Sequence, residues 1–145
     1  MIDRKLIQSV RDHVGDVSGL PVLFFEAADT ERRLPGLRMG SIKSCWPDYP
    51  DEANLAFGYN QLEVKLARAS PAAITRYDQA LELGLLLEDD DRKIVWAAAH
   101  SAARRQRGPA WKKIAKLLHM HPATVKRKFE RAILELWHKM LYFVD

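Results

Sequence analysis

The sequence predicts an all-α protein in which an N-terminal helical lobe, residues 1–69, precedes a C-terminal unit of three helices, residues 70–145. Apolar residues recur every three or four positions through most of the 145-residue chain, as in amphipathic helices. Ser70-Pro71 and His121-Pro122 each place a proline where the first residue of a helix is favoured. Residues 37–46 lack a helical period, and we expect them to be extended, with a short strand as one form.

Seven helical segments follow from these patterns: 2–14, 21–34, 52–68, 71–88, 92–104, 110–118 and 122 onward. Leu34-Pro35-Gly36 ends the second, because proline cannot continue a helix and glycine accepts the turn. The third is interrupted by Gly58 and Asn60. Asp89-Asp90-Asp91 ends the fourth and favours the start of the next helix, since acidic residues stabilise a helix N-terminus.

The apolar positions of the later helices predict which faces are buried. Inward positions are Ile74, Tyr77, Leu81 and Leu85 in the helix at 71–88, and Val95, Ala98 and Ala102 in the next. The last helix carries two apolar stripes beyond Arg131, namely Ile133-Leu136-Met140 and Leu134-Trp137-Leu141. A helix that is apolar on two faces has to be covered on both. We expect the N-terminal lobe to cover one stripe. A second subunit of a homodimer is one possible cover for the other.

Charge divides the chain into an acidic part and a basic part. Residues 1–91 hold 10 Lys and Arg against 16 Asp and Glu, a balance of −6, whereas residues 92–145 hold 13 against 3, a balance of +10. A segment of one sign beside one of the other indicates a half that binds a polyanion. The N-terminus has no unbroken apolar stretch of the signal-peptide kind and no segment suits a membrane, so we expect a cytoplasmic protein.

The stretch from Trp111 to Phe129 has the layout of a helix-turn-helix. Ile114, Ala115 and Leu118 share one helical face, and Val125 and Phe129 lie four residues apart in the following helix. His119-Met120-His121 separates the two helices. An apolar inner face beneath a basic outer face is typical of a unit that reads double-stranded DNA.

The geometry of such units assigns a role to each exposed side chain. The first turns of the last helix enter the major groove, so the residues expected to face bases are Ala123, Thr124, Lys126 and Arg127. Other basic residues are expected to contact phosphates: Arg104, Arg105, Arg107, Lys112, Lys113, Lys116, His121, Lys128 and Arg131.

On these residues, positions 90–140 resemble region four of bacterial sigma factors and the output domains of response regulators. The shared pattern comprises Trp111, Ile114-Ala115 and Leu118, a turn, then Thr124-Val125-Lys126 through Phe129. In that pattern the turn glycine is replaced by His119, which we therefore expect to adopt a strained or left-handed backbone. The usual serine or aspartate cap is replaced by His121.

The wider chain, with FFEAADTERRLPG, WPDYPDE and SPAAITRYDQAL, looks like a family of small uncharacterised proteins of phages and alphaproteobacteria. That resemblance implies a phage or prophage setting. It brings no activity with it.

These patterns predict a sequence-specific DNA-binding protein, most simply a transcriptional regulator of phage or prophage type. Two alternatives remain: a DNA-packaging or recombination accessory that recognises DNA as small terminase subunits do, and a module that binds RNA polymerase. The chain has no glycine-rich phosphate loop, nucleophile elbow or HExxH spacing, and its single cysteine, Cys45, cannot build a zinc cluster. We therefore expect no enzyme activity, no cofactor and no metal.

Overall fold

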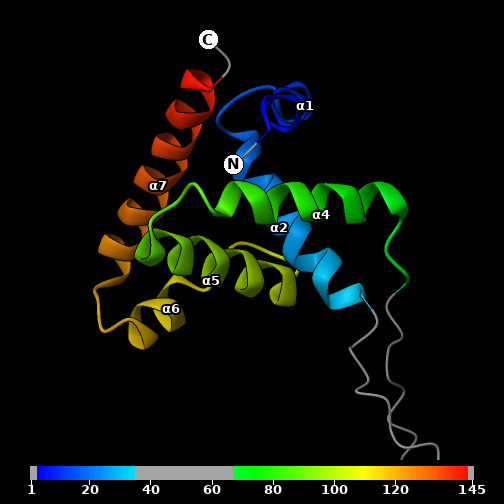
Figure 1. Ribbon diagram of the computed structural model, residues 1–145. Coiled ribbons are helices and arrows are strands. Elements are labelled where there is room, and N and C mark those ends of the chain that lie inside the picture. Colours follow the sequence, from blue (N-terminus) through cyan, green and yellow to red (C-terminus); the bar gives the residue numbers. More distant parts are fainter. Residues whose placement is uncertain (1–2, 35–66, 144–145) are drawn as a thin grey trace, which may run out of the picture.

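The computed structural model describes residues 3–34 and 67–143, and within them the fold is all-α, as predicted. The helices are α1 (Arg4–Val14), α2 (Gly19–Arg33), α4 (Pro71–Gly84), α5 (Asp89–Arg105), α6 (Trp111–Leu117) and α7 (Pro122–Tyr142) (Figure 1). The extended segment expected at 37–46 and the helix expected at 52–68 lie outside the described residues.

The junction between α1 and α2 is a tight turn built on Asp16. Gly15 ends α1 with a φ of 76°, a backbone that side chains other than glycine rarely adopt. The Asp16 carboxylate then accepts hydrogen bonds from the Ser18 hydroxyl at 2.6 Å and from the Gly19 amide at 3.2 Å. As a result α2 begins at Gly19, two residues before the predicted start at Pro21.

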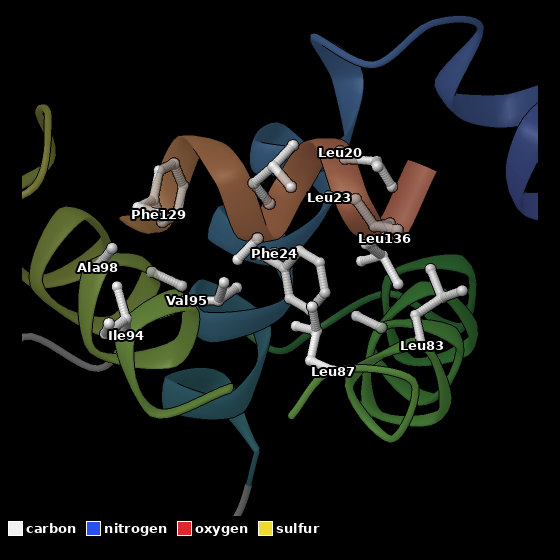
Figure 2. Close-up of a cluster of buried hydrophobic side chains, with 14 of the residues drawn as sticks. Leu20, Leu23, Phe24, Leu83, Leu87, Ile94, Val95, Ala98, Phe129 and Leu136 are labelled. Carbon is white, nitrogen blue, oxygen red and sulfur yellow. The ribbon is translucent and has the colours of Figure 1, made fainter. Parts of the chain in front are cut away.

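Helix α2 supplies the centre of the hydrophobic core. Phe24 is fully buried and meets the ring of Trp96 edge-on, with centroids 5.4 Å apart. Figure 2 shows Phe24 among side chains from α2, α5 and α7 and from the end of α4. One apolar cluster therefore joins helices from both predicted parts of the chain. The boundary between residues 69 and 70 stays a prediction.

The buried face of α4 differs from the predicted one. Ala80, Leu83 and Gly84 are buried, whereas Ile74, Leu81 and Leu85 are exposed; of the predicted inward residues, only Tyr77 is partly covered, and this burial raises the pKa of its phenol. The reason is close packing against α2 along the helix and against Trp96 of α5 at its end. A Cβ on Gly84 would lie 3.2 Å from the Trp96 indole nitrogen, so the small residues of α4 face the core.

Helix α4 also ends earlier than the predicted boundary at residue 88. Its last helical residue is Gly84, and the Arg92 guanidinium then binds two carbonyl oxygens, that of Gly84 at 2.8 Å and that of Leu87 at 2.9 Å. The Gly84 carbonyl also accepts from the Leu87 amide at 3.2 Å, so the guanidinium adds a second donor there and supplies one to Leu87 beyond the helix end. Leu87 turns into the core instead of continuing the helical stripe.

The predicted inner faces of α5 and α7 are confirmed. Val95, Ala98 and Ala102 are buried in α5, and Ile133, Leu136 and Met140 are buried in α7. Figure 2 shows α2 side chains beside Leu136, but α7 packs more on α5 than on α2, so the N-terminal part covers this first stripe only in part. The second stripe of α7 is covered incompletely: Trp137 and Leu141 are half-buried and Leu134 is 49% exposed.

Within the ranges 3–34 and 67–143, no helix has the length and apolarity that a bilayer crossing demands.

Candidate nucleic-acid interface

The turn between α6 and α7 fixes the angle between the two helices. His119 has a φ of 54°, which confirms the expected left-handed backbone. The Met120 amide donates to the Ala115 carbonyl at 3.0 Å, the bond that closes a Schellman motif at a helix C-terminus. Met120 packs against the core beside it. The turn therefore has the geometry that glycine normally supplies, with histidine in its place.

The start of α7 is capped by an imidazole. His121 has an extended backbone, and its Nδ1 accepts a hydrogen bond from the Ala123 amide at 3.2 Å. Pro122 follows at the first helical position, where a missing N–H costs nothing. The histidine thus performs the role of the usual serine or aspartate, and its predicted phosphate contact is limited to the other ring nitrogen, Nε2.

The end of α5 and the connector to α6, residues 106–110, bring one arginine each to the groove beside α6. Gln106 ends α5 with a φ of 54°, and its side-chain amide donates to the Ala103 carbonyl at 3.0 Å. Further along, the Ala110 amide donates to the Ser101 hydroxyl at 3.0 Å. The connector is thereby tied to α5 at both ends, with exposed Arg105 and Arg107 on either side of the left-handed residue.

A groove of about 580 Å³ lies between this connector and the first turns of α6 and α7. Its charged lining residues are Arg105, Arg107, Lys112, Lys113 and Lys126. In the part of the chain that the structure describes, no acidic side chain lines it. Four of these residues were predicted to face phosphates and Lys126 to face bases. The fold therefore gathers cations from three segments around one concave surface.

Of the other predicted site residues, one lines this groove and most of the rest are exposed on the same three helices. Ala123 lines the groove, and Thr124 and Arg127 are exposed on the same first turns of α7. Arg104 and Lys116 are exposed as well, while Lys128 is half-buried. The structure thus brings Arg105, Arg107, Lys112, Lys113, Ala123 and Lys126 together in one groove, and the roles of the remaining predicted residues stay predictions.

Arg131, further along α7, differs from the other predicted phosphate contacts because its guanidinium faces two carboxylates of the protein itself. It lies 3.7 Å from Asp91 and 3.4 Å from Glu135. Asp91 is only 5% exposed, so the pair also ties the start of α5 to the middle of α7. The sequence prediction treated Asp91 as part of a helix start alone, and no spacing rule connects residues forty positions apart.

Trp111 is a further groove residue that the predicted site did not include. The half-buried indole packs edge-on against Phe129, with centroids 5.3 Å apart, and Phe129 stacks on Phe25 at 6.4 Å. This aromatic series connects the groove to α2. The aromatic spacing of the motif contained the signal, but it was interpreted only as part of the helical pattern.

The groove, its two supporting turns and most of α7 lie inside a stretch that matches a known family model. Residues 32–136 match the model described as a domain of unknown function, DUF6362. The chain belongs to the DUF6362 family. No curated protein and no solved structure shows significant similarity to the chain.

Proposed function

We propose that this DUF6362 chain binds double-stranded DNA through α6 and the first turns of α7, as a transcriptional regulator of phage or prophage type. The observation that supports DNA binding most strongly is the groove lined by five cations from three segments. Phosphates repeat at close, regular intervals along duplex DNA, so a concave cluster of cations complements a backbone better than a small anion. The regulatory role and the phage setting rest on the sequence resemblance.

In the proposed complex the two classes of side chain have different tasks. Arg105, Arg107, Lys112 and Lys113 hold the backbone, which provides affinity without sequence preference. Thr124, Lys126 and Arg127 are exposed on the first turns of α7 and address base edges. The capped start of α7 and the Schellman turn keep these turns at one angle to α6, so both tasks are performed together.

Titration of labelled duplex at several salt concentrations tests DNA binding directly. The log–log slope of affinity against salt should be roughly −4 to −7 if about five to eight phosphates are contacted. A triple variant, Lys112→Gln, Lys113→Gln and Lys126→Gln, should reduce the slope by about 1.8, since the phosphate contacts of Lys112 and Lys113 are lost and each contributes about 0.9, whereas Lys126 addresses a base. Lys5→Gln on α1 is the matched control and should leave the slope unchanged. Absence of binding at low salt would contradict the proposal.

A pair of single variants tests the division between base and phosphate contacts. Arg127→Ala should relax sequence preference by roughly 1–3 kcal/mol at one position, whereas Lys113→Ala should weaken all sequences about equally. Both side chains are exposed, so neither change should alter folding. Equal effects of the two variants on all sequences would show that the first turns of α7 do not read bases.

A further inference from the structure

The outer face of α4 carries a row of exposed apolar side chains. Ile74, Leu81 and Leu85 are 37%, 43% and 66% exposed. Together with exposed Asp78 they form a row in which successive members are four, three and four residues apart. This is the spacing of a seam along which two helices pack. Single exposed apolar residues are ordinary on protein surfaces, but a row at seam spacing indicates a binding face.

The charges of α4 restrict what can bind this seam. Its exposed ionic side chains are Asp78 and Glu82, and exposed Glu88 follows the helix, whereas Asp89 and Asp90 beyond it pair with Arg92 and Lys93. The cation of this helix, Arg76, is directed towards α2, where its guanidinium donates to Glu26 at 2.6 Å. The seam therefore consists of three apolar side chains with the Asp78 carboxylate between them, and Glu82 adds a second exposed carboxylate to the same helix.

These charges disfavour a second copy of the same face. Two α4 helices packed on each other would bring the Asp78 and Glu82 carboxylates of both copies together, and like charges at an interface oppose association. Nucleic acid is disfavoured for the same reason. The complement of an acidic apolar seam is a helix with an apolar stripe flanked by lysine or arginine.

We infer that α4 is the docking site for a basic amphipathic helix of a partner protein. Leucine-like side chains of that helix pack between Ile74, Leu81 and Leu85, and one of its cations pairs with Asp78. In Figure 1, α4 and α6 lie on different sides of α5, so the docked helix leaves the basic groove free. The inference does not depend on DNA binding.

The platform is rigid enough for this role. The Ser70 hydroxyl accepts from the Ala73 amide at 3.2 Å and caps the start of α4. On the inner side, Ala80, Leu83 and Gly84 are buried against the core. The face is therefore formed before a partner binds. The conformational entropy lost on binding is then mainly that of the partner helix.

Two synthetic helical peptides of about 18 residues, roughly five turns, test the inference. Both carry the same leucine stripe, and the remaining positions are lysine in one peptide and glutamate in the other. Fluorescence anisotropy with the full chain should give at least about tenfold tighter binding for the lysine peptide at low salt. Amide shifts in the isotope-labelled chain should map that peptide to α4.

Three variants decide whether the seam is the binding face. Leu81→Ser should weaken the lysine peptide about tenfold, because a leucine contact is lost, and Asp78→Lys should remove the preference for lysine over glutamate. Leu117→Ser, on the exposed face of α6, is the matched control and should bind as the wild type does. The triple lysine variant of the groove should also bind normally, so that failure of the DNA proposal and of this one remain distinguishable.

Several results would overturn the inference. Equal affinity of the wild type and Leu81→Ser, or amide shifts centred elsewhere than α4, would place the peptide on another surface. A large fall in Tm for Leu81→Ser would show that the chain's own residues cover the seam. A dimer in sedimentation that Leu81→Ser disperses would identify a second copy as the occupant.

Discussion

Helices α4 and α7 begin in the same way and present opposite surfaces. Each has a capping side chain followed by proline: Ser70-Pro71 in α4 and His121-Pro122 in α7. Beyond the cap, α4 exposes carboxylates around an apolar seam, while the first turns of α7 expose lysine and arginine beside the groove. The start signals determine where a helix forms, and the outward-facing residues determine what it can bind.

The two helices nevertheless depend on one core. Side chains from α4 and α7 belong to the same apolar cluster, with α2 packed against both. The acidic and basic surfaces are thus two faces of one folding unit in the described residues. This arrangement predicts that core substitutions affect both faces together, whereas surface and cap substitutions affect one.

Phe24→Ala should have the largest effect, because it removes a fully buried ring from the middle of the shared cluster. We expect a loss of about 3–5 kcal/mol in the free energy of unfolding. Urea unfolding followed by circular dichroism measures it, with exposed Val22→Ala as a control that changes stability by less than about 0.5 kcal/mol. Two separate unfolding transitions would show that the faces are supported independently.

The two caps can be compared by removing each in turn. Ser70→Ala and His121→Ala should each cost about 0.5–2 kcal/mol, because a backbone N–H loses its acceptor. Only His121→Ala should also weaken duplex binding, since it loosens the first turns of α7. His121→Asn should restore stability. Equal loss of duplex affinity in both cap variants would contradict separate roles for the two faces.

His119→Gly should act in the opposite direction and stabilise the chain by up to about 1 kcal/mol, because glycine adopts positive φ without the steric cost of a side chain. Thermal unfolding measures the change. Gln106→Gly is the matched comparison at the same φ of 54°, and it should gain less because it loses the hydrogen bond to Ala103. A destabilised His119→Gly would show that the histidine side chain itself holds the turn.

The smallest effect is expected at Asp16, on the exposed turn before α2. The Ser18 hydroxyl, and then the Gly19 and Ser18 amides, lower the pKa of this carboxyl below its ordinary value of 3.8. The folded state therefore favours the ionised form, so its stabilisation is present above pH 3.8 and is lost as pH falls through the lower folded pKa. The Tm difference between wild type and Asp16→Asn should shrink as the pH falls below 3.8. Asp16→Asn should change neither duplex binding nor peptide binding.

The comparison of α4 with α7 also shows where pattern-based prediction succeeds. On α7 the first apolar stripe is continuous and its opposite face near the start is basic, so Val125, Phe129 and Leu136 were assigned correctly. On α4 apolar residues surround much of the helix, so spacing favoured the larger side chains. The core instead selected Ala80 and Gly84, because α4 packs closely on α2 and Gly84 lies against Trp96.

The sequence by itself determined the all-α class, the two helix starts at Pro71 and Pro122, the unusual turn at His119 and the concentration of positive charge in the last third of the chain. Those features depend on local backbone chemistry and on composition, which neighbouring residues reveal. The tertiary structure alone decided that Arg105, Lys112 and Lys126 line one groove, that Asp91 meets Arg131, and that α4 turns Leu81 outward. Each of these depends on how closely helices distant in sequence can pack, and side-chain volume at the contact sets that distance.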